Sequence, residues 1–218
     1  MISILIPIYN GIEFIDESVM SVINQTYTDW ELLIGVNGHP ENSNVFLTAK
    51  KYEIDSNNSN KIRVFDLFHI KGKSNTLNEM IKLCNYNYIA ILDVDDIWLP
   101  EKLAIQSNFL NIYDVIGSRC VYFGDTKLIL PLPIGDITMF DFTKTNPIIN
   151  SSSVIRKELC FWVENGIEDY DLWLRLRKMT KKFYNCDEVL VKHRIHNTSA
   201  FNSKGNDLLA QNLLKLYK

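Results

Sequence analysis

Three aspartates within four positions form the densest group of reactive side chains in the sequence: Asp93, Asp95 and Asp96. They directly follow an apolar run, Tyr88–Leu92, which has the length and composition of a strand buried on both faces of a parallel sheet. Open α/β sheets bind ligands at the carboxyl ends of their strands. Neighbouring carboxylates repel one another unless a cation lies between them, and such oxygen ligands suit Mg²⁺ or Mn²⁺. By itself the pattern is equally compatible with a polar turn in which Asp96 caps the next helix.

A second acidic cluster, Glu168, Asp169 and Asp171, opens a predicted amphipathic helix over residues 168–180. The apolar face of this helix consists of Leu172, Trp173, Leu176 and Met179. Carboxylates in a first helical turn interact favourably with the helix dipole and need no catalytic role. The residues alone therefore favour a structural role for this cluster.

Lys73 and His196 are candidate ligands for phosphate and metal. Lys73 follows Gly72 and precedes a predicted helix, and helix N-termini bind phosphate. The segment lacks the upstream glycine of a P-loop, so a solvated lysine fits it equally well. We expect Ser74 to be the N-cap of this helix. His196 follows a predicted strand; a neutral imidazole binds Mn²⁺, although an ordinary polar histidine fits that place as well.

Pro7, Tyr9 and Asn37 lie at the carboxyl ends of the first two predicted strands, and are candidate contacts for a nucleotide base and ribose. Tyr9 has a ring that could stack on a base, or it packs within its own turn. Trp98 fits either a sugar pocket or, more commonly, a core position, and we expect Trp173 to lie in the core.

These residues depend on a regular first half of the chain. Apolar runs predict four strands, and amphipathic or polar stretches predict three helices between them; the strands are expected over 2–6, 31–36, 62–65 and 88–92, the helices over 13–25, 42–54 and 72–84. Such alternation requires crossover connections and a mostly parallel sheet. Pro7 is expected to end the first strand, because it cannot donate a hydrogen bond.

The second half is less regular. The patterns predict a helix over 100–112, then short strands, the helix over 168–180, and a final amphipathic helix from Asn206; the strands are expected over 114–117, 120–123, 148–155, 182–186 and 189–193. We find no repeat and no low-complexity linker, so the sequence predicts one α/β domain.

Composition excludes several classes of function. The chain has 218 residues and a net charge of −3 with no long basic run, which disfavours nucleic acid as the main partner. The four cysteines are far apart and form no CxxC pair, as expected for buried thiols in a reducing compartment. No apolar run reaches the roughly 18 residues of a transmembrane helix, and the N-terminus does not resemble a signal peptide. We therefore expect a cytoplasmic protein.

Five stretches, in this order, resemble the motifs of the family 2 glycosyltransferases, which have the GT-A fold: Ser3–Gly11, Ser21–Tyr27, Leu92–Asp96, Glu168–Leu176 and Arg194–Ser199. The resemblance implies a mostly parallel central sheet flanked by helices, with a smaller irregular acceptor-side part. It implies a single catalytic domain over 1–218, in which 1–97 binds nucleotide sugar and metal and 98–218 binds the acceptor. A fainter resemblance is to glycosyltransferase domains of large DNA viruses of algae.

The resemblance also implies residue roles. Asp169 matches the catalytic base, and Asp93, Asp95 and Asp96 match the metal motif for Mn²⁺ or Mg²⁺. Asp95 is the expected direct ligand, Asp93 contacts the ribose or a metal-bound water, and Asp96 is a ligand, a support of the ligands or a cap. His196 is the further candidate ligand from its own chemistry. Pro7, Tyr9, Asn37, Lys73 and Asp93 are the expected nucleotide-sugar contacts. The implied reaction is inverting transfer of one hexosyl or deoxyhexosyl group, from a UDP- or dTDP-sugar, to a hydroxyl of a glycan or glycoconjugate. Additional domains beyond this chain are compatible with the resemblance.

Two departures leave the nucleotide open. Where the family has VDDGS, this chain has Gly35–His39, and where an arginine–asparagine pair is usual it has Leu77–Asn78. One alternative is a sugar-phosphate nucleotidyltransferase, but that enzyme needs a glycine-rich, arginine-containing loop where this chain has Pro7–Gly11. The other alternative is a non-catalytic module that binds nucleotide sugars, which the altered second-strand motif allows and the intact Asp95 and Asp169 disfavour.

Overall fold

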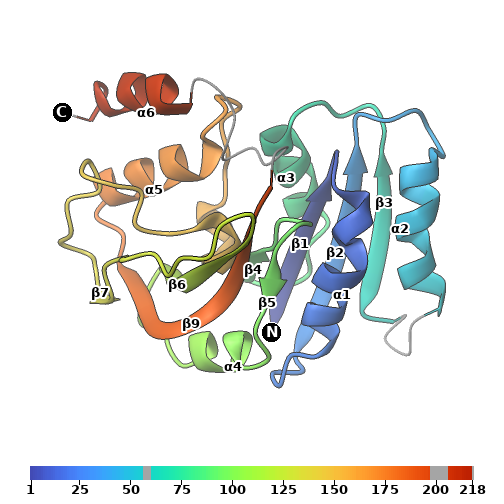
Figure 1. Ribbon diagram of the computed structural model, residues 1–218, viewed down its shortest axis with the longest axis horizontal. Coiled ribbons are helices and arrows are strands. Elements are labelled where there is room, and N and C mark those ends of the chain that lie inside the picture. Colours follow the sequence, from blue (N-terminus) through green and yellow to red (C-terminus); the bar gives the residue numbers. More distant parts are fainter. Residues whose placement is uncertain (56–59, 197–205, 218) are drawn as a thin grey trace.

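The helices and strands of the computed structural model follow the predicted alternation in the first half of the chain (Figure 1). The structure describes residues 1–55, 60–196 and 206–217. Its elements, in chain order, are β1 (Ile2–Ile8), η1 (Ile12–Phe14), α1 (Ile15–Ile23), β2 (Trp30–Asn37), α2 (Asn44–Asp55), β3 (Ile62–Leu67), α3 (Lys73–Lys82), β4 (Tyr88–Ile91), β5 (Ile97–Trp98), α4 (Lys102–Ser107), β6 (Val115–Gly124), β7 (Gly135–Asp136), η2 (Asn150–Ser152), β8 (Val154–Arg156), η3 (Lys157–Leu159), α5 (Glu168–Lys178), β9 (Phe183–Ile195) and α6 (Asn206–Leu214).

One mixed sheet runs through the molecule in the order β3-β2-β1-β4-β8-β6-β9-β5, with β7 also paired to β9. The four strands of the first half are mutually parallel, as predicted. β8 is antiparallel to both β4 and β6, whereas β6 and β9 are parallel to each other. All four parallel strands therefore present their carboxyl ends at one edge of the sheet, where polar loops follow.

Two hydrophobic cores cover the two faces of the sheet. All seven residues of β1 are buried, and alternate side chains enter different cores: Ile4 and Ile6 pack toward α1 and α2, Leu5 toward α3 and α5. Figure 1 shows α1 and α2 on the near face of the parallel strands and α3 behind them. Burial on both faces explains why these strands are continuous apolar runs and do not alternate.

Pro7 does not end β1, which continues to Ile8. The pairing of β1 with β4 ends at Leu5 and Ile91, whereas the pairing with β2 continues to Ile8. The missing N–H of Pro7 therefore lies where β1 has no further partner on the β4 side, and it costs the sheet no hydrogen bond.

Other predictions for the second half were wrong in their boundaries. The strands predicted over 114–117 and 120–123 are one strand, β6, and those over 182–186 and 189–193 are one strand, β9, with irregular register opposite Ser118 and Arg119. The strand predicted over 148–155 is a 3-10 turn followed by the short β8. The helix predicted over 100–112 is regular only from Lys102 to Ser107.

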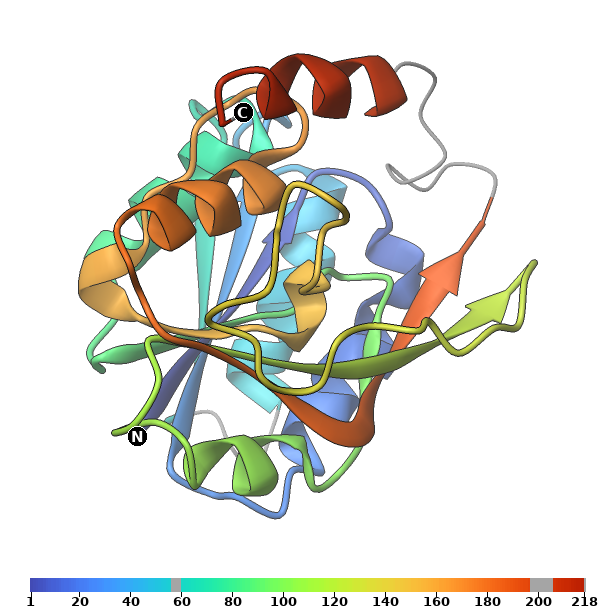
Figure 2. The same ribbon diagram turned by 90° about the vertical axis from the view of Figure 1, so that its left-hand side faces the viewer.

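The pairing of β9 with β5 places the last strand of the second half next to the end of the first half. Figure 2 shows β9 as a long bent strand beside β6, and β5 pairs with it through Ile97 and Trp98. β5 begins immediately after the acidic residues 93–96. The last residues of β9 consequently lie next to the acidic loop.

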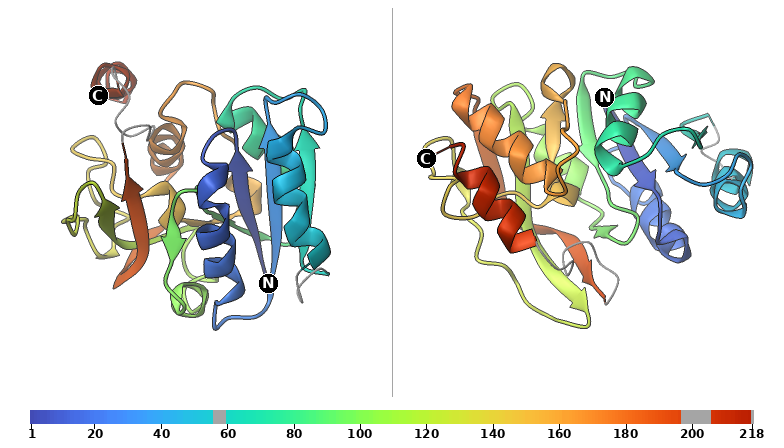
Figure 3. Two further views of the ribbon diagram at one scale, coloured as in Figure 1. Left: turned by 45° about the vertical axis from the view of Figure 1, so that its right-hand side comes forward. Right: turned by 90° about the horizontal axis from the view of Figure 1, so that it is seen from above.

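The final helix, α6, lies alongside α5 (Figure 3). Leu213 is buried in the second core, with Leu214 and Tyr217 packed against it, so this helix does find partners within the chain. None of the described helices is long and apolar enough to cross a membrane.

Candidate functional site

Asp96 is fully buried and does not cap α4. Its Oδ1 accepts a hydrogen bond from the backbone N–H of Arg194 at 2.8 Å, and its Oδ2 lies 2.9 Å from Nδ1 of His193. Burial alone would lower the pKa of His193, but the Asp96 carboxylate outweighs it and raises that pKa to about 9. His193 is therefore a cation near neutral pH, and it neutralises the buried acid.

Asp95 lies beside His196, with 3.1 Å between Oδ2 of the carboxylate and Nε2 of the imidazole. The guanidinium Nε of Arg194 donates to the backbone carbonyl of Asp95 at 2.9 Å, which fixes the loop. Burial, and then the charges of Asp96 and Asp93, raise the pKa of Asp95.

Asp93 contacts polar groups of Lys73, Asn150 and Ser151 within the described part of the chain. Lys73 Nζ lies 2.7 Å from its Oδ1, the side-chain amide of Asn150 lies 3.3 Å from both carboxylate oxygens, and its backbone N–H donates to Ser151 Oγ. Burial alone would raise the pKa of Asp93, but the Lys73 ammonium and the amide lower it overall. Asp93 is therefore held as a carboxylate.

Lys73 connects this acidic loop to α5. Besides Asp93, its ammonium contacts Glu168 Oε1 at 3.4 Å, and these two carboxylates raise its pKa against the opposing effect of burial. α3 begins at Lys73, and Ser74 is not its N-cap: the Ser74 hydroxyl donates to the Val163 carbonyl, while the Ser74 N–H donates to Glu164 Oε2. The ammonium is thus a fixed bridge between two acidic regions.

Asp169 lies in the first turn of α5, next to Glu168, and the charge of Lys73 also acts on it. Its Oδ2 accepts a hydrogen bond from Asn146 Nδ2 at 3.1 Å. Burial and the neighbouring Glu168 raise the pKa of Asp169 to about 6, against the lowering effect of Lys73. A carboxylate with such a pKa is a stronger base than an ordinary aspartate and is still largely ionised at neutral pH.

The other predicted ligand residues lie at the ends of β1 and β2. Pro7 and Asn37 are buried, whereas Tyr9 is 56% exposed. The rings of Tyr9 and His39 lie 5.4 Å apart, and the His39 ring also contacts the Tyr9 carbonyl. Gly38 has a φ of 71°, and a Cβ there would lie 3.0 Å from the Tyr9 ring, so glycine allows this close contact. The Tyr9 ring is therefore accessible at this end of the site, with the partly exposed His39 packed beside it.

A divalent cation fits one part of the acidic loop better than the others. Among residues 1–55, 60–196 and 206–217, no three His, Cys, Asp or Glu side chains are arranged to hold a metal ion. Asp93 is engaged by Lys73, and Asp96 by His193. Asp95 and His196 form a two-residue oxygen and nitrogen pair, which suffices for Mg²⁺ or Mn²⁺ where phosphate and water supply the remaining ligands.

Several residues at the site were not predicted from the sequence: His193, Arg194, Asn146, Asn150 and Ser151. His193 neutralises Asp96, a role that the sequence analysis did not assign to it. Its position, three residues before His196 at the end of one strand, was the only sequence signal for it. No sequence pattern marked Asn146, Asn150 or Ser151 as part of the site, because their partners are remote in the sequence.

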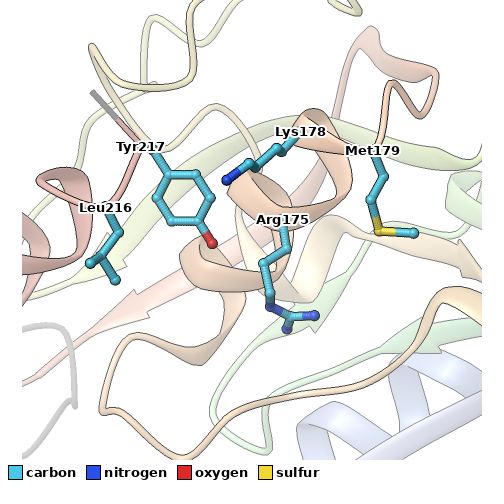
Figure 4. Close-up of a pocket in the computed structure, with 5 residues that line it drawn as sticks. All are labelled: Arg175, Lys178, Met179, Leu216 and Tyr217. Carbon is cyan, nitrogen blue, oxygen red and sulfur yellow. The ribbon is translucent and has the colours of Figure 1, made fainter.

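Two pockets of the structure lie away from this site. One, of about 330 Å³, is lined by residues at the far end of α5 and just after α6: Arg175, Lys178, Met179, Leu216 and Tyr217 (Figure 4). The other, of about 480 Å³, lies against α3 and includes Asn78 and Lys71. Neither pocket is lined by the acidic residues 93–96 or 168–169, although each lies against a helix, α5 or α3, that also contributes to the site.

Comparison with known proteins agrees with this arrangement. The model of "Glycosyl transferase family 2" matches residues 3–167, which is most of the chain. The chain belongs to glycosyl transferase family 2. The O-antigen biosynthesis glycosyltransferase WbnJ of Escherichia coli is 30% identical over 211 residues, covering 91% of this chain and 81% of that protein.

A second relative of this family 2 glycosyltransferase is also from Escherichia coli. It is the UDP-Glc:alpha-D-GlcNAc-diphosphoundecaprenol beta-1,3-glucosyltransferase WfgD, 27% identical over 230 residues, covering 97% of this chain and 83% of WfgD. No relative named here bears on the resemblance to viral domains, which stays a prediction.

Solved structures share the GT-A fold. The structure of S. aureus TarS 1–349 in complex with UDP-GlcNAc has a TM-score of 0.77 at 14% identity, covering 99% of this chain and 66% of that one. The mannosyltransferase PcManGT from Pyrobaculum calidifontis, in complex with GDP-Man and Mn²⁺, has a TM-score of 0.71 at 13% identity, covering 91% of this chain and 58% of that one. This chain therefore spans less than two thirds of either solved chain.

Proposed function

We propose that this family 2 glycosyltransferase is an inverting, metal-dependent enzyme. It transfers one hexosyl or deoxyhexosyl group from a UDP- or dTDP-sugar to a hydroxyl of a glycan or glycoconjugate. The observation that carries the proposal is the position of Asp169. It is a carboxylate with a pKa of about 6, next to the Glu168 that shares Lys73 with Asp93.

Asp169 is the general base of this reaction. It takes the proton from the acceptor hydroxyl as the hydroxyl oxygen attacks the anomeric carbon and the nucleoside diphosphate leaves. A single displacement driven by one base inverts the anomeric configuration. The pKa of about 6 leaves Asp169 ionised at neutral pH, while making it basic enough to accept the proton.

Asp95 and His196 are the residues that would hold Mn²⁺ or Mg²⁺ in our proposal, with Asp93 on the ribose or on a water of the ion. A bound divalent cation stabilises the negative charge of a diphosphate leaving group. Lys73 holds Asp93 in place and adds a positive charge at the same edge of the sheet. The Mn²⁺ in the PcManGT complex supports this assignment by analogy.

The nucleotide lies across the ends of β1 and β2 in our proposal, with Tyr9 against the base and Pro7 and Asn37 lining the site. The names of WfgD and of the TarS complex specify uridine nucleotides, which supports a UDP-sugar. We further propose that the chain is one catalytic domain, in which residues 1–97 bind the donor and 98–218 the acceptor. The cytoplasmic location stays a prediction.

Thermal stabilisation by nucleotides tests the proposal first. We expect UDP or dTDP to raise the melting temperature only with Mn²⁺, and GDP and CMP to have little effect; a ligand at 100 times its Kd adds about 2.7 kcal/mol. Asp95→Asn should abolish the metal-dependent shift, whereas Asp187→Asn, on an exposed side chain of β9, should keep it. Metal-dependent binding without turnover of any donor would favour the non-catalytic module, and no stabilisation by any nucleotide would contradict the proposal.

A further inference from the structure

One short segment, residues 146–151, contacts both acidic regions of the site, and we call it the bridging segment. Asn146 Nδ2 donates to Asp169 Oδ2 at 3.1 Å. Four residues later, the Asn150 amide lies 3.3 Å from both carboxylate oxygens of Asp93, and Ser151 Oγ accepts the Asp93 N–H at 3.1 Å. Asp93 follows β4 and Asp169 lies in the first turn of α5, so the segment joins the two halves of the site.

Two buried indoles fix the bridging segment. Trp173 Nε1 donates to the Ile148 carbonyl at 3.2 Å, and Trp98 Nε1 donates to the Ser151 carbonyl at 2.7 Å. Trp173 belongs to α5, which carries Asp169 in its first turn, and Trp98 belongs to β5, immediately after the acidic loop. The segment is therefore held both by α5, which carries Asp169, and by β5, which directly follows the loop that carries Asp93.

The orientation of the Asn150 amide indicates that it serves Asp93. A carboxylate only accepts hydrogen bonds, so the NH₂ group must face Asp93 and the amide oxygen must point away. Asn150 Oδ1 is buried and has no hydrogen-bond partner among the described residues. An unpartnered buried acceptor is unfavourable for folding, so this asparagine is not the best choice for stability.

We propose that Asn146 and Asn150 are positioning residues with separate tasks. Asn146 orients the base Asp169 through its hydrogen bond, and Asn150 holds Asp93 for the donor. This inference rests on the proposed function. It adds that one rigid segment sets the relative positions of the base and the donor-binding carboxylate.

The Asn146 hydrogen bond acts on the pKa of Asp169 together with burial and the neighbouring charges. Burial and Glu168 raise the pKa of Asp169, and Lys73 lowers it. The Asn146 hydrogen bond also lowers this pKa, because it stabilises the carboxylate. Removing the Asn146 amide should therefore raise the pKa of Asp169, so that the base stays protonated up to a higher pH.

The experiment compares Asn146→Ala, Asn150→Ala and wild type. For Asn146→Ala we expect the acidic limb of the kcat/KM profile to move to higher pH by at least about half a unit, with the Kd for UDP unchanged. For Asn150→Ala we expect the Kd for UDP in the presence of Mn²⁺ to rise about 10-fold or more, with the acidic limb unmoved. If the two asparagines had a purely structural role, neither variant would change the acidic limb of kcat/KM or the Kd for UDP without changing the other.

Asn185→Ala is the matched control. Asn185 is a fully buried asparagine of β9 whose amide donates to the carbonyl of Pro147, inside the bridging segment, without touching a carboxylate. We expect this variant to melt at a lower temperature. It should show neither a selective shift of the acidic limb of kcat/KM nor a selective rise in the Kd for UDP. If Asn185→Ala reproduced the selective effects, or if the Asn146 and Asn150 variants changed the same quantity, the separate tasks would be refuted.

NMR titration of the Asp169 carboxyl, in protein with ¹³C-labelled aspartate, requires no turnover. If the wild type turned over no donor, the proposed function would fail, but the titration would still test the Asn146 contact. An Asp169 pKa that is higher in Asn146→Ala than in wild type supports the inference, and an unchanged pKa overturns it.

Discussion

Asp169 illustrates at the scale of one residue how function and stability conflict. Its folded-state pKa of about 6 lies above the usual value of 3.8, so burial makes the ionised form less favourable. The stability that the protonated form provides is complete below the unfolded pKa, and is lost as the pH rises through about 6. At neutral pH the enzyme therefore carries an unfavourable charge that its proposed chemistry needs.

Asp169→Asn should separate these two effects. We expect turnover to fall at least about 10²-fold, because the general base is lost, while UDP binding is retained. We also expect a melting temperature above that of wild type at pH 8 and no such gain at pH 4, where the wild-type carboxyl is protonated. Steady-state kinetics and thermal melts at the two pH values check this; near-normal turnover would remove Asp169 from the mechanism.

At the scale of one element, α4 contains a lysine where a hydrophobic residue is normal. Lys102 is fully buried, donates to Gln106 Oε1 at 2.7 Å, and lies 4.0 Å from the centre of the Trp98 ring. Burial lowers the pKa of Lys102 to about 7 from its ordinary 10.5. Between these values the unfolded chain binds a proton that the folded chain does not, so the free energy of unfolding rises with pH.

Lys102→Met removes this proton linkage while retaining most of the side-chain volume. We expect the free energy of unfolding of wild type, relative to the variant, to rise by about 2 kcal/mol from pH 7 to pH 9. The loss of the Gln106 contact affects the variant equally at every pH and cancels in this comparison. Urea denaturation of both proteins at several pH values measures the difference, and parallel pH dependences would mean that Lys102 keeps its proton.

At the scale of the whole molecule, α6 attaches the end of the chain to the core beneath α5. Leu213 is 7% exposed within the second core, whereas Leu216, after the same helix, is 73% exposed. The contacts that hold Asp93, Asp95 and Asp169 come from other elements: Lys73 of α3, His196 after β9, and Asn146. We therefore expect α6 to contribute to stability and not to the proposed chemistry.

We therefore expect Leu213→Ala to lower the free energy of unfolding by about 2–5 kcal/mol, as for other buried leucines. Leu216→Ala, the matched control, should change it by less than about 0.5 kcal/mol. Both variants should keep the metal-dependent stabilisation by UDP. Equal effects of the two substitutions on chemical denaturation would show that α6 does not pack on α5 in solution.

Local patterns in the sequence were sufficient to predict the parallel half of the sheet and the positions of its loops. An apolar run such as Tyr88–Leu92 must be buried on both faces, and its alternation with helices leaves only crossover connections. For the same local reason Asp93 and Asp95 could be placed at a strand end, and Asp169 at a helix start. These predictions depended on residues close together in the chain.

The groups that neutralise the acids and hold the base could be identified only from the way distant segments pack in the fold. His193 and Asp96 are 97 residues apart, Asn150 and Asp93 are 57 apart, and Asn146 and Asp169 are 23 apart. Their contacts depend on the bend of β9 and on the two indoles that anchor residues 146–151, and no local pattern encodes either. A polar side chain acquires its partner, and with it its charge state, only when distant segments pack together.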